Sequence, residues 1–225
     1  TKPYETATWD AYSAERGGYP HFMIKEINEE PEAVTATLRS RIKNLYPSLE
    51  VSGLSSDKVK SIRQIHIVAC GTAMHAGLIG KHAIERLARI PVNVEIASEF
   101  RYKEPILASD DLVIVISQSG ETADTLAALR LAKAEGVGTV AIVNVPGSTI
   151  AREADSVLYT RAGPEIAVAS TKAYSVQIAL LYLLAVHLGE ARGMLSSYRV
   201  MELCKGLETS PHFIAEALEL GEECR

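Results

Sequence analysis

The sequence has no long run of basic residues and no apolar stretch long enough to cross a bilayer. Its 225 residues carry a formal net charge of -5, which argues against a nucleic-acid-binding surface. The longest apolar run, IALLYLLAVHL from Ile178 to Leu188, is too short for a membrane span and contains a histidine. We therefore expect a buried helix here, and neither a nucleic-acid nor a membrane partner.

Cysteine is scarce, and its spacing does not suit a metal site. Cys70, Cys204 and Cys224 are odd in number and share no metal-type spacing. His75 and His82 lie too far apart to form the usual pair of ligands on one helix. The N-terminal stretch TKPYETATWD also lacks the apolar core of a signal peptide. We expect no metal and a reduced, cytoplasmic compartment.

Two nucleotide-binding motifs are missing as well. After the first predicted strand the glycines are Gly71 and Gly77, which do not fit G-x-G-x-x-G. No G-x-x-x-x-G-K-[ST] string occurs anywhere in the chain. A nucleotide-binding function would therefore rest on fold analogy alone.

What the sequence does contain is a regular alternation of apolar strands and helices. The predicted strands are QIHIVAC, VNVEIA, DLVIVIS, GTVAIVNV and ADSVLYT. Their near-continuous Val and Ile indicate a parallel sheet that is covered on both faces. With right-handed crossovers this predicts an α/β, doubly wound, flavodoxin-like parallel five-stranded sheet with helices on both faces. An antiparallel domain would show tight hairpin signals, and we find none.

The flanks of this alternation have patterns of their own. Residues 1–18 lack periodicity and predict a linker or tail, so the domain is expected to span residues 19–225 with flanking helices at both ends. From His21 the pattern is helical, with Pro31 suited to the first turn of a second helix. Asp57 is expected to cap a short helix, SEFRYKEP is a short polar segment, and long helices follow from about Ser170.

Three loops bring small and hydroxyl residues to the carboxyl ends of the strands, where ligands of such sheets bind. They are CGTA, SQSGET and EIAVASTK. In the second loop, Ser117, Ser119 and Thr122 can donate hydroxyl hydrogens, and Gly120 permits a close backbone approach. The following helix directs free N–H groups at the same place, which suits a phosphate monoester held without lysine. The competing interpretation is plain helix capping by Ser119 or Thr122. Glu121 would repel a phosphate and is expected to point away.

Five motifs in this order resemble the glutamine–fructose-6-phosphate aminotransferase family. They are YPHFMIKEI, ACGT, ISQSGETADTL, NVPGS and EIAVASTKAY. The resemblance runs from about Tyr19 to the C-terminus and falls on the first of that family's two sugar-isomerase (SIS) domains. It implies a SIS fold, a site for open-chain fructose 6-phosphate or glucosamine 6-phosphate, and no metal or other cofactor.

The resemblance also implies which residues bind the substrate. The phosphate loop would supply Ser117, Gln118, Ser119, Gly120 and Thr122. The loop that lines the sugar would supply Cys70, Gly71 and Thr72, and the loop on the other side Val168 and Ser170. Two positions depart from the family pattern, because Ala73 stands where Ser is common and Ala167 where Gly is frequent.

By the same resemblance, this chain is expected to be a fragment without catalytic residues of its own. The family's glutaminase half begins with a catalytic cysteine, whereas this chain begins with Thr1. A second SIS domain would supply the base, the Schiff-base lysine and the ring-opening histidine. We expect both missing domains as partners, a homodimer, and no turnover by the fragment alone.

The sequence leaves open two other functions and the roles of several charged residues. A non-catalytic SIS sugar-phosphate sensor would follow a basic helix-turn-helix, which the N-terminal segment does not show. A single-domain isomerase would need a glutamate and a histidine at the site, where His75 is the candidate. Lys172 is expected to pair with Glu165 or another carboxylate rather than form a Schiff base. Arg101 and Lys103 are expected to be surface charges, although they could steer an anion.

Overall fold

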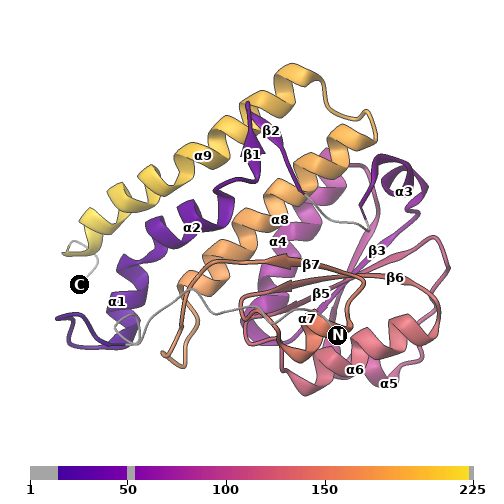
Figure 1. Ribbon diagram of the computed structural model, residues 1–225, viewed down its shortest axis with the longest axis horizontal. Coiled ribbons are helices and arrows are strands. Elements are labelled where there is room, and N and C mark those ends of the chain that lie inside the picture. The colour runs from indigo at the N-terminus through magenta and orange to yellow at the C-terminus, as the bar shows by residue number, and fades with distance from the viewer. Residues whose placement is uncertain (1–14, 50–53, 223–225) are drawn as a thin grey trace.

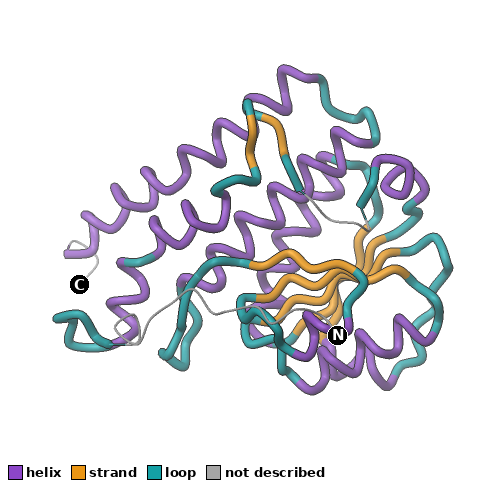
Figure 2. Tube along the Cα trace, in the orientation of Figure 1, coloured by secondary structure: helices purple, strands orange, loops and turns teal. Residues whose placement is uncertain are grey.

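Five parallel strands form the central sheet of the computed structural model, which describes residues 15–49 and 54–222. The strands are β3 (Ile65–Ala69), β4 (Val92–Ile96), β5 (Leu112–Ser117), β6 (Gly138–Val143) and β7 (Ser156–Tyr159). Their order in the sheet is β4-β3-β5-β6-β7 (Figures 1 and 2). This is the flavodoxin-like order, and it confirms the predicted fold.

Helices cover both faces of this sheet. One face carries α4 (Gly71–Leu87) and α8 (Lys172–Ala191), and the other carries α5 (Ala97–Tyr102), α6 (Ala123–Ala134) and α7 (Thr149–Glu153). The apolar residues of β3 and β5 are fully buried and alternate between the two cores. Continuous Val and Ile were therefore a sound indication of a sheet with no solvent-facing side.

A further layer lies outside α8. It consists of α1 (Phe22–Asn28), α2 (Glu30–Leu38) and α9 (Ser197–Glu219). The described residues also form two short helices, α3 (Ser56–Ser61) and η2 (Leu220–Glu222). In Figure 1, α2 and α9 run alongside α8 at the end of the molecule away from α6. Pro31 lies at the first turn of α2, as predicted. The N-terminal and C-terminal helices thus pack on the face that α8 covers.

Two local elements were not anticipated, and one local prediction was wrong. A small antiparallel hairpin joins β1 (Ile42–Lys43) to β2 (Tyr46–Pro47), although no hairpin was expected. Its turn residue Leu45 has a positive φ of 63°, and leucine is not a residue by which such a turn is recognised in a sequence. The side chain of Leu45 packs against the core on the α8 face. Residues 97–102, which overlap the segment predicted only to be polar, form the short helix α5. Ser55, not Asp57, is the N-cap residue of α3.

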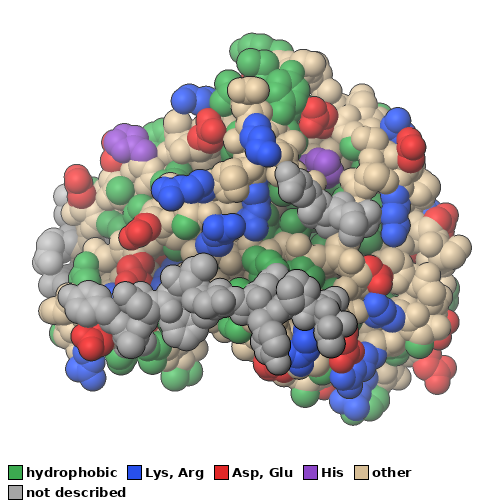
Figure 3. All heavy atoms as spheres, viewed as in Figure 1, with side chains coloured by type: hydrophobic (Ala, Val, Ile, Leu, Met, Phe, Trp, Pro, Cys, Tyr) green, Lys and Arg blue, Asp and Glu red, His purple; other side chains and the backbone are tan. Residues whose placement is uncertain are grey.

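The apolar helix α8 lies inside the protein. The helix extends beyond the apolar run Ile178–Leu188, so, contrary to the expectation from that run, its 20 residues are long and apolar enough to cross a membrane. However, 67% of its most apolar part is buried inside the structure. The expected buried helix is thus confirmed. On the face shown in Figure 3, the Lys and Arg side chains of the described residues are interspersed with Asp and Glu.

The two described cysteines lie in different environments. Cys70 is half-buried, whereas Cys204 is fully buried in α9, and both are free thiols. Burial, together with the nearby carboxylates of Glu190 and Glu208, raises the pKa of Cys204 to about 11. Cys204 is therefore a structural residue. Cys224 lies outside the described residues.

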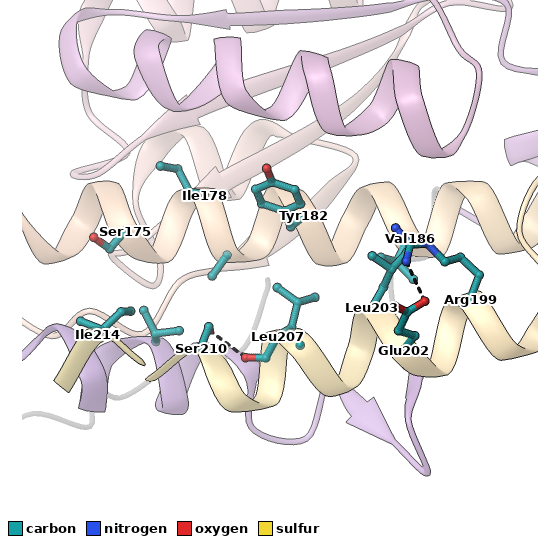
Figure 4. A pocket seen from close by; sticks show the side chains of 13 residues that line it. Ser175, Ile178, Tyr182, Val186, Arg199, Glu202, Leu203, Leu207, Ser210 and Ile214 are labelled. Atoms are coloured by element: carbon teal, nitrogen blue, oxygen red, sulfur yellow. Dashed lines mark hydrogen bonds and ion pairs between the residues drawn. The ribbon is translucent and has the colours of Figure 1, made fainter. Parts of the chain in front are cut away.

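An apolar groove runs between α8 and α9 (Figure 4). It has a volume of about 490 Å³ and is lined from α8 by Ile178 and Tyr182 and from α9 by Leu203 and Leu207. Further along α9, the helix contains Pro211, which cannot donate to the carbonyl of Leu207. The hydroxyl of Ser210 donates to that carbonyl instead, at 2.8 Å. Both helices that line the groove are thus continuous, and α9 is not broken at Pro211.

Candidate functional site

A polar pocket of about 280 Å³ opens at the carboxyl ends of β3 and β5. This is where the strand order reverses, because β3 lies between β4 and β5. The pocket is lined by Cys70, Thr72, Ala73, Ile116, Ser117, Gln118, Ser119, Thr122, Glu165, Ala167, Val168, Ser170 and Gln177. The lining residues include no Lys, Arg or His. Any anion bound here must therefore be held by hydroxyl, amide and backbone donors.

The loop after β5 folds back so that its hydroxyl groups gather. The Ser117 and Thr122 hydroxyl oxygens lie 2.9 Å apart, and the Gly120 N–H group donates to the Ser117 hydroxyl at 3.0 Å. The Glu121 N–H group donates to the Ser119 hydroxyl at 3.2 Å. Two backbone bonds to neighbouring segments, Asn144 N–H to Gln118 carbonyl and Ile150 N–H to Gly120 carbonyl, hold the loop in place.

Two helices begin at this pocket without a side-chain cap. Cys70 is the N-cap residue of α4 and Thr122 that of α6, and neither side chain accepts a hydrogen bond from its helix. Ser119 accepts from Glu121, which precedes the helix. The capping interpretation therefore does not describe this loop, and the first N–H groups of both helices keep their capacity to bind an anion.

Glu121 turns away from the pocket. Its side chain is exposed, and one carboxylate oxygen accepts from the Thr149 N–H group at 2.7 Å, at the start of α7. That backbone hydrogen bond is the main cause of the lowered pKa of Glu121, and the nearby Arg152 lowers it further. The one acidic residue of the loop is thus directed at a different helix, as the sequence analysis expected.

The third loop is tied to the start of α8 by Glu165. Its carboxylate accepts from the N–H groups of Thr171 and Ala173, each at 3.0 Å, and from the Ser170 hydroxyl at 3.1 Å. The N-terminus of α8 is therefore already occupied by a carboxylate from its own chain. The anion-binding capacity of the pocket lies instead with α4 and α6.

The N-terminal helix α1 holds this third loop from outside. Glu26 is 2% exposed, and its carboxylate accepts from the N–H groups of Ile166 and Ala167 at 2.6 and 3.1 Å. One helical turn on, Glu29 forms an ion pair with the buried Lys172, with 2.6 Å between Nζ and Oε2. Lys172 therefore pairs with a carboxylate, as expected, but the partner is Glu29. It does not line the pocket.

Replacing Glu26 with Ala is expected to lower the free energy of unfolding by about 1–3 kcal/mol, because two backbone N–H groups lose their acceptor. Equilibrium unfolding in urea measures this. Glu32→Ala is the matched control, because Glu32 is an exposed glutamate on the neighbouring helix α2. Equal changes in the two variants would show that Glu26 does not anchor the loop.

Most of the predicted site residues meet in one place. Eight of the ten line the pocket, and the other two, Gly71 and Gly120, shape its loops through positive φ angles of 55° and 68°. Val168 is fully exposed at the rim. Glu165, Ile116 and Gln177 also line the pocket but were not among the residues predicted from the sequence, although a glutamine in the apolar helix α8 was a visible signal.

The charged residues considered beside the site lie elsewhere. His75 is exposed and does not line the pocket. Arg101 pairs with Asp124 and Lys103 with Glu95, so both have carboxylate partners at the surface. Among residues 15–49 and 54–222, no three His, Cys, Asp or Glu side chains are grouped so that they could hold a metal ion.

Comparison with protein families gives a match to the SIS domain over residues 58–187, more than half of the chain. The chain belongs to the SIS domain family. The matched region begins in α3 and ends within α8, so it contains all five strands of the central sheet and the three loops of the pocket.

Curated relatives of this SIS domain chain are much longer than it is. The chain is 54% identical over 218 residues to the glutamine–fructose-6-phosphate aminotransferase (isomerizing) of Clostridium tetani. The matched residues make up 96% of this chain and 36% of that protein. The enzyme of the same name from Caldanaerobacter subterraneus is 53% identical over 94% of this chain and 35% of its own length. The chain thus spans about a third of the length of the curated relatives that it matches.

Solved structures agree with this assignment. The C-terminal domain of glucosamine-fructose-6-phosphate aminotransferase from Francisella tularensis superposes with a TM-score of 0.89 at 38% identity, covering 93% of this chain and 59% of that chain. Glucosamine-6-phosphate deaminase from Thermotoga maritima superposes with a TM-score of 0.66 at 24% identity, covering 86% and 54%. At that identity the second likeness shows the fold alone.

Proposed function

We propose that the pocket binds the phosphate group and carbon chain of an open-chain hexose phosphate. The observation that carries this proposal is the meeting of the Ser117, Ser119 and Thr122 side chains with two uncapped helix N-termini. Phosphate esters bind well at such termini because backbone N–H groups and the helix dipole both favour negative charge. The ten predicted site residues are accordingly proposed as the substrate-binding set.

Fructose 6-phosphate is expected to bind the purified protein, and inorganic phosphate is expected to compete for the same place. The physical reason is that both present the same oxygens to the hydroxyl loop. Calorimetric titration with the sugar phosphate, repeated in the presence of inorganic phosphate, measures the competition. Sugar-phosphate binding that inorganic phosphate leaves unchanged would contradict a phosphate subsite in this loop.

We further propose that the chain serves a glutamine–fructose-6-phosphate aminotransferase, which forms glucosamine 6-phosphate and glutamate from fructose 6-phosphate and glutamine. The names of the relatives support this reading over that of a sugar-phosphate sensor. In this proposal residues 19–225 are the first SIS domain and residues 1–18 a linker. A glutaminase domain and a second SIS domain would supply the ammonia and the catalytic groups, and the enzyme would work in the cytoplasm.

We also propose that two copies of the chain associate as a homodimer. Three large apolar side chains of α1 and α9 are exposed, namely Met23 (45%), Tyr198 (77%) and Phe213 (61%). A second copy would cover this surface, and a symmetric pair is the commonest closed arrangement of identical chains. Light scattering at micromolar concentration is expected to give twice the chain mass of 24.3 kDa. A clean monomer that persists after tenfold concentration would contradict the dimer.

A further inference from the structure

Gln177 is a buried polar residue in the most apolar helix of the protein. It lies in the second turn of α8 and is 4% exposed, yet it lines the polar pocket. No hydrogen bond joins its side-chain amide to any other described residue. The Gln177 amide is not among the fully buried side-chain atoms that lack a partner, so the small exposed part of this residue includes its amide, which is open to the pocket. An amide held open to a pocket in this way can hydrogen-bond a ligand that enters it.

Two other polar side chains at this end of α8, those of Lys172 and Ser175, have partners on a different side of the helix. Lys172 pairs with Glu29, and the Ser175 hydroxyl donates to Glu30 at 2.7 Å. Both partners come from the outer helical layer, and Ser175 lines the groove shown in Figure 4. Gln177 follows Ser175 by two positions, which is about 200° around the helix. It therefore faces away from that groove and toward the pocket.

Gln177 and the hydroxyl loop approach the pocket from opposite faces of the sheet. Gln177 comes from α8, which covers the same face as α4, whereas the loop of Ser119 and Thr122 leads into α6 on the other face. Ile116, the last of the β5 residues whose side chains lie in the core on the α8 side, also lines the pocket. A ligand that reaches both ends must therefore be longer than a phosphate ion.

The hydroxyl loop and Gln177 also differ in the kind of hydrogen bond that they can offer a ligand. A phosphate dianion only accepts hydrogen bonds, and the hydroxyls and helix N–H groups are donors suited to it. A glutamine amide both donates and accepts, and so do the hydroxyl groups of a sugar chain. The amide is thus matched to the uncharged part of a phosphosugar.

We propose that Gln177 is a specificity-determining residue, whose amide hydrogen-bonds an oxygen of the sugar chain and so distinguishes a hexose phosphate from phosphate itself. The inference rests on the proposed function of the same pocket. It assigns to α8 a direct part in ligand recognition, in addition to its place in the core.

The test replaces Gln177 with Met, which keeps the length and helix propensity of the side chain but removes its hydrogen bonds. Calorimetry on the purified protein then compares dissociation constants for fructose 6-phosphate and inorganic phosphate. The variant is expected to bind fructose 6-phosphate about tenfold more weakly, the loss of one hydrogen bond, and phosphate unchanged within about twofold. Ser175→Ala, on the opposite side of the same helix, is the matched control and is expected to change neither.

Unchanged affinity for fructose 6-phosphate, or an equal loss for both ligands, would overturn the inference. If the variant fails to fold, the wild-type protein still decides the matter by NMR. The side-chain amide signals of Gln177 should shift on titration with fructose 6-phosphate but not with inorganic phosphate, and signals that shift with neither ligand refute the role. Absence of any sugar-phosphate binding by the wild type would instead refute the proposed function. If Ser117 and Ser119 prove necessary while Gln177→Met binds normally, only the inference fails.

Discussion

Replacing Ser117 and Ser119 together with Ala is expected to weaken fructose 6-phosphate binding at least about 100-fold. Each hydroxyl lost from a charged phosphate removes a hydrogen bond worth about 1.5–3 kcal/mol, so the pair removes about 3–6 kcal/mol. Since about 1.4 kcal/mol corresponds to a factor of ten, the two losses together should exceed two orders of magnitude. Among the described residues, no lysine or arginine lines the pocket to compensate.

Calorimetric titration of the double variant with fructose 6-phosphate measures this effect. Ser210→Ala is the matched control, because Ser210 is a serine of α9 whose hydroxyl bonds within its own helix. The control is expected to bind as the wild type does. A folded double variant with unaltered affinity would contradict the assignment of the phosphate site to this loop. The hydroxyl cluster would then have a structural role only.

Replacing Gly120 with Ala is expected to cause the largest loss of stability of any single change in the site. Gly120 has φ +68°, and an added Cβ atom would lie 2.0 Å from the hydroxyl oxygen of Ser148 and 2.5 Å from its Cβ. The left-handed backbone costs a non-glycine residue about 1–2 kcal/mol. Overpacking against the buried Ser148 adds about 1–3 kcal/mol. The free energy of unfolding should fall by about 2–5 kcal/mol, and sugar-phosphate binding should weaken because the loop must move.

Two other glycines separate the backbone cost from the clash. Gly136 and Gly147 have φ +73° and +70°, and an added Cβ atom would meet nothing within 4 Å at either position. Their Ala variants are expected to lose only the backbone contribution, about 1–2 kcal/mol. Thermal or urea unfolding of the three variants measures the difference. A Gly120→Ala variant as stable as these controls would show that Ser148 can yield to the added methyl group.

Much of the site could be predicted from the sequence because it is local in the sequence. The residues after a strand are known once the strand is recognised, and parallel strands bring those ends to one edge of the sheet. Cys70 follows β3 and Ser117 ends β5, so the pocket they share follows from the strand pattern and the crossover rule alone. The positive φ of Gly120 and its close contact with Ser148 were not predicted from the sequence.

The parts that sequence reasoning missed are contacts between distant segments. Glu26 holds the N–H group of Ile166 across 140 positions of the chain, and Lys172 meets Glu29 across 143. No periodicity records such a pairing, because periodicity reports only which face of an element is buried. The hairpin turn at Leu45 was missed for a related reason, since its unfavourable backbone is maintained by burial against the core.

By itself, the sequence determined the α/β sheet, its burial on both faces and the three loops at its edge, because strand length, apolar runs and loop composition are local properties. Only the tertiary structure decided which carboxylate fixes each loop and where the polar residues of α8 point. Glu165 could have been the ion-pair partner of Lys172, but its carboxylate binds the N-terminus of α8. Lys172 pairs instead with Glu29, between α1 and α2. Those choices depend on how α1, α2 and α8 pack together, and packing is a property of the whole fold rather than of any one segment.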